Sequence, residues 1–189
     1  MLNKPLILSL SLSALLLAGC STTHYISIDP KVEVQTTNLK NDRVIDVSTH
    51  TALTNTVGSI KTGINERADI FLTNDIKESV KQSVLTGLKT LGFTPDQGVM
   101  PAADLQIDII KMRYTTKVES LKTIATLEFE LKTTLSAKGQ TYKANYGSKK
   151  TREYGTMPYQ QDVEDDMNDL ASQTVNRLLS DPNILSLLQ

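Results

Sequence analysis

The apolar positions along the chain change period several times, and each period predicts a different element. From Tyr25 to Val34 and from Arg43 to Val47, apolar and polar residues alternate as in half-buried strands. Pro30 interrupts the first run, so we expect an edge strand or two short strands there. Between residues 50 and 69 no period is visible. This predicts a long irregular loop, with a short hairpin around Gly58 as an alternative and a brief strand at its C-terminal end.

Two segments have the period of an amphipathic helix. The first is expected after Asn74 or Asp75 as cap and ends at Gly92; its stripe is Ile76, Val80, Val84, Leu88 and Leu91. The second covers about residues 159–179, with Thr156 as cap and Asp181-Pro182 as stop; its stripe is Val163, Met167, Leu170, Thr174 and Leu178. Residues 184–188 are expected to form a final apolar turn.

Three strand-like runs lie between the predicted helices, at residues 103–118, 124–136 and 141–151. The first changes parity, which predicts a bulge near Ile109-Ile110; the alternative is a strand that is covered on both faces there. Lys138-Gly139 predicts a tight turn between the other two. The element order is therefore β-β-α-β-β-β-α. We expect one α+β domain over residues 25–189, a two-layer sandwich of an antiparallel sheet of about four to five strands packed on two helices.

The first nineteen residues read as a signal peptide and not as part of the domain. Lys4 precedes an apolar run at residues 6–17, which is too short to span a bilayer. Leu17, Ala18, Gly19 and Cys20 follow, and this sequence resembles the bacterial lipobox. The resemblance implies cleavage before Cys20 and lipidation of its thiol; the alternative is an ordinary signal peptide that happens to contain a cysteine.

Residues 20–24 are then the lipidated cysteine and a short tether. Four extended residues reach about 14 Å, so the domain is expected close to the bilayer surface. The second residue of the mature chain is Ser21 and not Asp, which in enteric-type lipoprotein sorting implies the outer membrane, with the domain facing the periplasm.

Composition excludes several classes of function. The net charge of -1, or -2 once the leader with Lys4 is removed, argues against nucleic-acid binding. A single cysteine excludes an internal disulfide and a cysteine-rich zinc site. The two histidines, His24 and His50, have no spaced partner for a metal and are expected on the surface. No metal and no cofactor is expected, apart from the covalent lipid on Cys20.

Other patterns suggest chemistry only weakly. Gly58 to Gly63 has the glycine spacing of a phosphate loop but lacks the Lys-Ser/Thr pair after it. The acids of the last helix lack the central glycine of a calcium loop, so they are expected to be solvated and to complement the helix dipole; they are Asp162, Glu164, Asp165, Asp166 and Asp169.

The chain has one basic cluster, formed by Lys149, Lys150 and Arg152. It is a candidate surface for a ligand or partner, such as lipid phosphates or anionic glycans, with a solvated strand end as the alternative. Tyr142 and Tyr146 beside it are expected to pack in the core.

Across most of its length the chain resembles the YajG-type lipoproteins of Gram-negative bacteria. The resemblance rests on the lipobox, on the long run 103–118, and on shorter stretches that read Arg43-Val44-Ile45-Asp46, Leu91-Gly92-Phe93 and Leu178-Leu179-Ser180-Asp181-Pro182. It implies an outer-membrane lipoprotein and no particular reaction.

The expectation is therefore a membrane-anchored, non-enzymatic accessory, assembly or scaffold factor that binds a protein partner of the envelope. A rival is a binding module for an envelope small molecule or glycan, using the 50–69 segment and the basic cluster. A weaker third class is a hydrolase with an unrecognised carboxylate pair.

Overall fold

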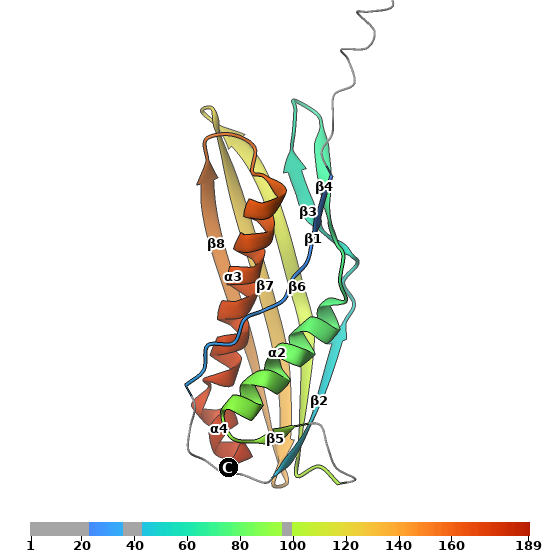
Figure 1. Ribbon diagram of the computed structural model, residues 1–189, viewed down its shortest axis with the longest axis vertical. Helices are drawn as coiled ribbons and strands as arrows, with labels where there is room; N and C mark the ends of the chain where they lie inside the picture. Colours follow the sequence, from blue (N-terminus) through green and yellow to red (C-terminus); the bar gives the residue numbers. More distant parts are fainter. Residues whose placement is uncertain (1–22, 36–42, 96–99) are drawn as a thin grey trace, which may run out of the picture.

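The computed structural model describes residues 23–35, 43–95 and 100–189, and within them eight strands form one mixed sheet with three helices on one face (Figure 1). The strands are β1 (His24–Ile26), β2 (Val44–Thr51), β3 (Thr56–Lys61), β4 (Arg67–Leu72), β5 (Thr94–Pro95), β6 (Ala103–Glu119), β7 (Lys122–Ala137) and β8 (Gln140–Tyr154). The helices are α2 (Ile76–Thr90), α3 (Gln160–Leu179) and α4 (Pro182–Leu188). The α+β class is as predicted, with more strands and one more helix than expected.

The sheet is built around a long antiparallel meander of β6, β7 and β8. The other edge of β6 is shared, because β2 pairs with its first half and β3 with its second half, both in parallel. β5 adds to β2, while β4 and then β1 extend the sheet from β3. The prediction of a wholly antiparallel sheet is wrong. Alternation identifies a strand, but it does not reveal which strand lies beside it once a helix such as α2 intervenes.

The predicted bulge in β6 is confirmed. Ile109 faces Leu131 and Lys111 faces Glu130, so Ile110 has no partner on β7. On the other side of β6 the bulge coincides with residues 52–55, where the chain leaves β2 and returns as β3.

The prediction of a long loop over residues 50–69 is wrong, because β3 and β4 form an antiparallel hairpin here. The alternative of a short hairpin is confirmed, as is the brief strand at the end of the segment, but the turn is not at Gly58. The turn lies at residues 62–66, and Gly58 lies within a strand. A Cβ atom at Gly58 would come within 1.8 Å of the Tyr114 carbonyl oxygen, so the glycine permits β3 to approach β6.

The core lies between the sheet and the helices. Along β7, buried residues alternate with more exposed ones as predicted, and Leu127, Phe129 and Leu131 are fully buried. Val80 of α2 and Met167 of α3 pack over this face. The opposite side of the sheet is here called the helix-free face, and along β7 it carries the more exposed, mostly polar residues.

Residues 27–34, here called the strap, are extended but form no strand, which corrects the prediction of a strand up to Val34. The strap crosses between α2 and α3 (Figure 1). Its amides bond to side chains of α3, as does that of Tyr25 in β1: Tyr25 to Gln160, Ser27 to Glu164, Asp29 to Asn168, Lys31 to Ser172 and Glu33 to Asn176, all at 2.7–3.0 Å. Its apolar side chains point into the core, which explains a strand-like pattern without a strand partner.

The helix ends are set by local side chains. Asp75 caps α2 as predicted, by accepting from the Lys77 amide, and Gly92 follows in the left-handed conformation. The N-cap of α3 is Tyr159 and not Thr156; its amide donates to Asp162 at 2.9 Å. None of the described helices combines the length and apolarity required to cross a bilayer.

Candidate functional site

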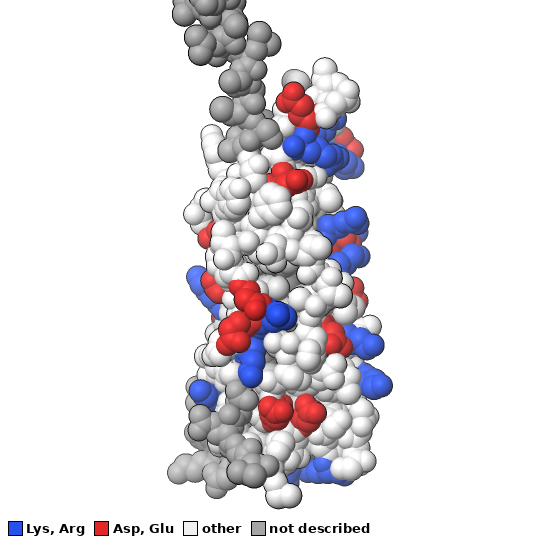
Figure 2. All heavy atoms as spheres, turned by 90° about the vertical axis from the view of Figure 1, so that its right-hand side faces the viewer, with Lys and Arg blue, Asp and Glu red and all other residues white. Residues whose placement is uncertain are grey.

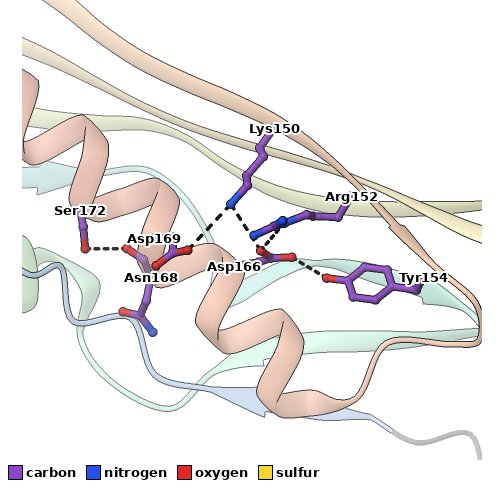
Figure 3. Close-up of polar contacts among 7 residues, drawn as sticks. All are labelled: Lys150, Arg152, Tyr154, Asp166, Asn168, Asp169 and Ser172. Carbon is purple, nitrogen blue, oxygen red and sulfur yellow. Dashed lines mark hydrogen bonds and ion pairs between the residues drawn. The ribbon is translucent and has the colours of Figure 1, made fainter.

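A buried carboxylate, Asp166 of α3, lies at the centre of a cluster of donors from β8 (Figure 3). The residue is only 6% exposed. Its carboxylate accepts from Arg152 Nε at 2.8 Å and from the Tyr154 hydroxyl, and Lys150 Nζ lies 3.6 Å away. Lys150 also lies 3.8 Å from Asp169. The sequence pattern predicted that Asp166 belongs to a solvated acidic face, and for this residue the prediction is wrong.

The charges of this cluster satisfy one another. The hydrogen bond and charge of Asp166 raise the pKa of Arg152, and burial together with the hydrogen bond to Asp166 raises that of Tyr154. The carboxylate is thus buried and has two cations and a phenol beside it. The cluster therefore fastens the outer strand β8 to α3 and leaves little for a ligand to bind.

The three residues of the predicted basic cluster do not form one surface, because successive side chains of β8 point to opposite faces of the sheet. Lys150 and Arg152 point toward α3, whereas Lys149 points to the helix-free face, where its Nζ lies 3.4 Å from Glu128. Lys111 pairs with the same carboxylate at 3.4 Å. Burial favours the neutral form of Glu128, but the bonds and charges of the two lysines outweigh it and lower the pKa. All three predicted site residues are thus engaged in ion pairs on two different faces.

A second, half-buried cluster joins β8 to the start of α4. Tyr142 and Tyr146 both donate to Asp181, the N-cap of α4, so these tyrosines pack inward as predicted. Burial alone would raise the pKa of Asp181, but the bonds from Tyr146, the Asn183 amide and Tyr142 outweigh it and lower the pKa.

The histidines lie in different surroundings. His50 is exposed as predicted, but His24 is only 3% exposed, and its Nε2 lies 3.2 Å from the Pro158 carbonyl oxygen. His24 therefore belongs to the fold and not to a solvated tether. Within the described ranges no three His, Cys, Asp or Glu side chains cluster in a way that would hold a metal ion.

The best candidate site is a hollow of about 520 Å³ where β2 leaves β6 at the bulge. His50, Asp108 and Lys132 lie in register across β2, β6 and β7, and they form a polar row along its floor. Leu53 and Ile110 contribute apolar side chains, and Ile110 is 43% exposed. Throughout this article these five residues are called the bulge hollow.

Local chemistry explains why the bulge hollow opens here. The Thr51 hydroxyl donates to the Ile109 carbonyl oxygen at 3.0 Å and accepts from the Leu53 amide at 3.1 Å. A side chain thus replaces the strand ladder at the point where the backbone turns away. The bulge turns Ile110 toward the helix-free face, which elsewhere carries charged side chains of both signs (Figure 2, right-hand side).

A hollow of similar size, about 510 Å³, lies between the strap and the C-terminal half of α3. All of its lining residues are polar, and four of them already take part in the strap bonds: Lys31, Glu33, Ser172 and Asn176. No apolar residue of the described part of the chain lines it, unlike the hollow at the β6 bulge.

Sequence reasoning missed Ile110 and Leu53 as site residues. The parity change that predicted the bulge was the available signal for Ile110, because a bulge residue lies outside the alternation. The predicted lipobox, Leu17 to Cys20, lies outside the described residues.

Comparisons with known proteins agree with the fold. A sequence model of a family described as uncharacterised lipoproteins matches residues 30–189. A Xanthomonas campestris protein of the DUF330 family has 13% identity, with a TM-score of 0.56 over 87% of this chain and 94% of that one. A second uncharacterised protein has 12% identity and a TM-score of 0.52 over 88% and 99%. At these identities the structural likeness shows the fold alone.

No curated protein matches the sequence. The match to the family covers most of the chain, including every helix and all strands except β1. The chain belongs to this family of uncharacterised lipoproteins.

Proposed function

We propose that this protein is an outer-membrane lipoprotein, anchored through lipid on Cys20, whose periplasmic domain is a non-enzymatic accessory or assembly factor. In this proposal the bulge hollow binds a protein partner of the envelope. The observation that carries it is the exposed Ile110, which a bulge places beside Leu53 on a face that carries mostly polar and charged side chains.

The membrane part of the proposal is supported by the lipobox-like sequence and by membership of a lipoprotein family. Ser21 at the second mature position supports the outer membrane as destination. The finer resemblance to the YajG-type lipoproteins supports the same location.

The binding part is supported by the shape and chemistry of the bulge hollow. It is open to solvent and combines two apolar side chains with a row of one carboxylate, one ammonium group and one imidazole. An apolar centre with a polar rim is typical of a protein-binding surface. The other clusters described above have their charges already paired.

The proposal is tested by placing a photo-crosslinking amino acid at Ile110 or at Leu53 in cells. Thr126, on the same face of β7, is the matched control position. We expect the same discrete protein adduct from both test positions and none from the control. Adding Leu53→Lys to the Ile110 crosslinker should reduce the adduct at least about tenfold, because a desolvated lysine opposes apolar contact.

Adducts of equal intensity at Thr126, or adducts that Leu53→Lys leaves unchanged, would refute binding at the bulge hollow. The volume of about 520 Å³ also fits a small molecule, which supports the glycan or small-ligand module as the second candidate. That alternative predicts no protein adduct at Ile110, and a rise in melting temperature of the purified protein with envelope sugars that Lys132→Glu abolishes.

A further inference from the structure

The exposed apolar side chains of this protein gather at one end. In the described part of the chain, six of the eight large apolar residues with high exposure lie where β1 and α3 begin and where the β3–β4 and β6–β7 turns and the end of β8 meet (Figure 1): Tyr25, Ile64, Val118, Leu121, Met157 and Tyr159. Ile64 and Leu121 are 92% and 93% exposed. An exposed apolar cluster of this kind indicates an interaction surface.

Several contacts hold these segments together as one end. Gly58 and Ser59 of β3 lie in register with Tyr114 and Thr115 of β6, so the two turns project side by side. The Lys61 amide donates to Thr116 Oγ1 at 2.7 Å. His24 contacts the Pro158 carbonyl group, which brings the start of β1 beside the loop before α3. We call this end the tip surface.

Leu121 at the tip surface lies in a turn whose backbone conformation is unfavourable for a leucine. Ser120 and Leu121 both have positive φ, at 47° and 70°. The turn at the opposite end of the meander also has two positive φ angles, but there the second residue is Gly139. An exposed leucine in a strained turn contributes no packing to the fold, and such strain is a reason to look for a function.

The predicted tether directs the tip surface toward the bilayer. Three residues separate Cys20 from His24, so the start of β1 lies within about 14 Å of the lipidated cysteine. β6 has 17 residues and spans about 55 Å. The tip surface is therefore much nearer to the anchor than the opposite end of the molecule.

The geometry points to the tip surface as a second membrane contact, in which Leu121 and Ile64 insert into the interfacial region of the bilayer that holds the lipid anchor. This inference rests on the proposed anchor at Cys20. Tyr25 and Tyr159 lie several residues back from the turns, and tyrosine is a side chain favoured at the membrane–water boundary. Charge contributes little, because Lys117 pairs with Glu119 at 2.6 Å and Lys122 with Glu153 at 3.0 Å.

The sequence makes a direct test available, because it contains no tryptophan. Leu121→Trp, Ile64→Trp and the control Met100→Trp are prepared as full lipidated chains in zwitterionic vesicles with brominated acyl chains. Met100 is 87% exposed and lies beside the start of β6, at the opposite end. We expect the new tryptophan of Leu121→Trp and of Ile64→Trp to lie about 5–10 Å deep in the bilayer. Bromine should then quench roughly half of its fluorescence, and its emission should shift to the blue. The tryptophan of Met100→Trp should not be quenched.

Flotation of each variant with the vesicles separates the anchor from the tip contact, and Cys20→Ala is the reference that should not float. If the lipidated variants float but neither Leu121→Trp nor Ile64→Trp is quenched more than Met100→Trp, the tip contact is refuted while the anchor stands. If Cys20→Ala floats like the others, or none floats, the anchor at Cys20 is refuted, and the orientation argued from it falls as well.

Discussion

Two turns of the same length close the two ends of the β6–β7–β8 meander with different residues. Lys138-Gly139 suits the positive φ angles of its turn, whereas Ser120-Leu121 does not. We therefore expect Leu121→Gly to raise the free energy of unfolding by about 0.5–1 kcal/mol, because relief of strain exceeds the added entropy of the unfolded chain. Urea unfolding followed by circular dichroism measures the change.

Gly139→Ala is the reciprocal control for this prediction. Nothing lies within 4 Å of a Cβ atom built at Gly139, so its effect reports backbone strain alone. We expect a loss of about 1 kcal/mol there. A loss of stability in Leu121→Gly would show instead that the leucine packs on the domain, which would contradict its assignment to the membrane.

Asp181 provides a prediction of pH dependence at the same scale. Its pKa is lowered in the fold, so its contribution to stability is fully present above the unfolded pKa of about 4 and is lost as pH falls through the folded value. Asp181→Asn keeps an N-cap residue but removes the charge that accepts from Tyr142 and Tyr146.

At pH 7 we expect the free energy of unfolding of Asp181→Asn to be about 1–2 kcal/mol lower than that of the parent protein. The gap should close as pH falls below about 4, because the parent loses the same charge. Guanidinium titrations at pH 7 and pH 3 measure both values. A gap of equal size at the two pH values would mean that the carboxylate charge contributes nothing.

Single residues also show where sequence reasoning stops. The sequence predicted the β6 bulge and the Asp75 cap, because both follow from spacing within one element. It did not predict burial of Asp166 or His24, since their partners Arg152 and Pro158 come from elsewhere in the chain. A charged residue on a helix looks solvated until the strand opposite supplies its counter-ions.

At the scale of elements, β1 and the strap together can follow α3 over five contacts because the spacing between contacts is nearly the same in the extended chain and in the helix. Every fourth residue of α3 meets every second residue of the chain from Tyr25 to Glu33. Four helical residues rise about 6.0 Å and two extended residues about 6.6 Å, so five contacts form in sequence without loss of register. The helix side chains thus replace the neighbouring strand that an extended segment ordinarily needs.

Asn168 is the central contact, since it accepts from the Asp29 amide and donates to the Ser27 and Glu164 carbonyl oxygens. We expect Asn168→Ala to reduce the free energy of unfolding by about 1–2 kcal/mol and to speed hydrogen exchange at the Asp29 amide. Gln161→Ala, on the exposed side of the same helix, should change stability by less than about 0.5 kcal/mol. Equal effects of the two variants would contradict a structural role for the strap contacts.

Most individual elements were predictable, but their neighbours were not. The helices and the three long strands follow from their periods, while the parallel pairing of β2 and β3 with β6 depends on long-range contacts. The strap shows the same limit, because alternation records only that one side is buried. The candidate site was predictable only through the bulge, and Leu53 lay in a segment without any period.

At the scale of the whole molecule, the two proposed surfaces lie at different heights. Ser120, directly after β6, lies ten positions beyond Ile110, which corresponds to about 33 Å along the strand. With the tip surface on the bilayer, the bulge hollow would face sideways into the periplasm, beyond the headgroups. A partner bound there would be held at a fixed distance from the membrane and in a fixed orientation.

The strap contacts also determine how the domain would respond to mechanical load. Tension between the membrane and a partner would enter the fold through the segment that follows Cys20 and would act along the strap, across the direction of its hydrogen bonds with α3. In this shear geometry all the contacts bear the force together, whereas a peeling geometry would break them one by one. The attachment would therefore resist a pull that would detach a flexible linker from the body of the domain.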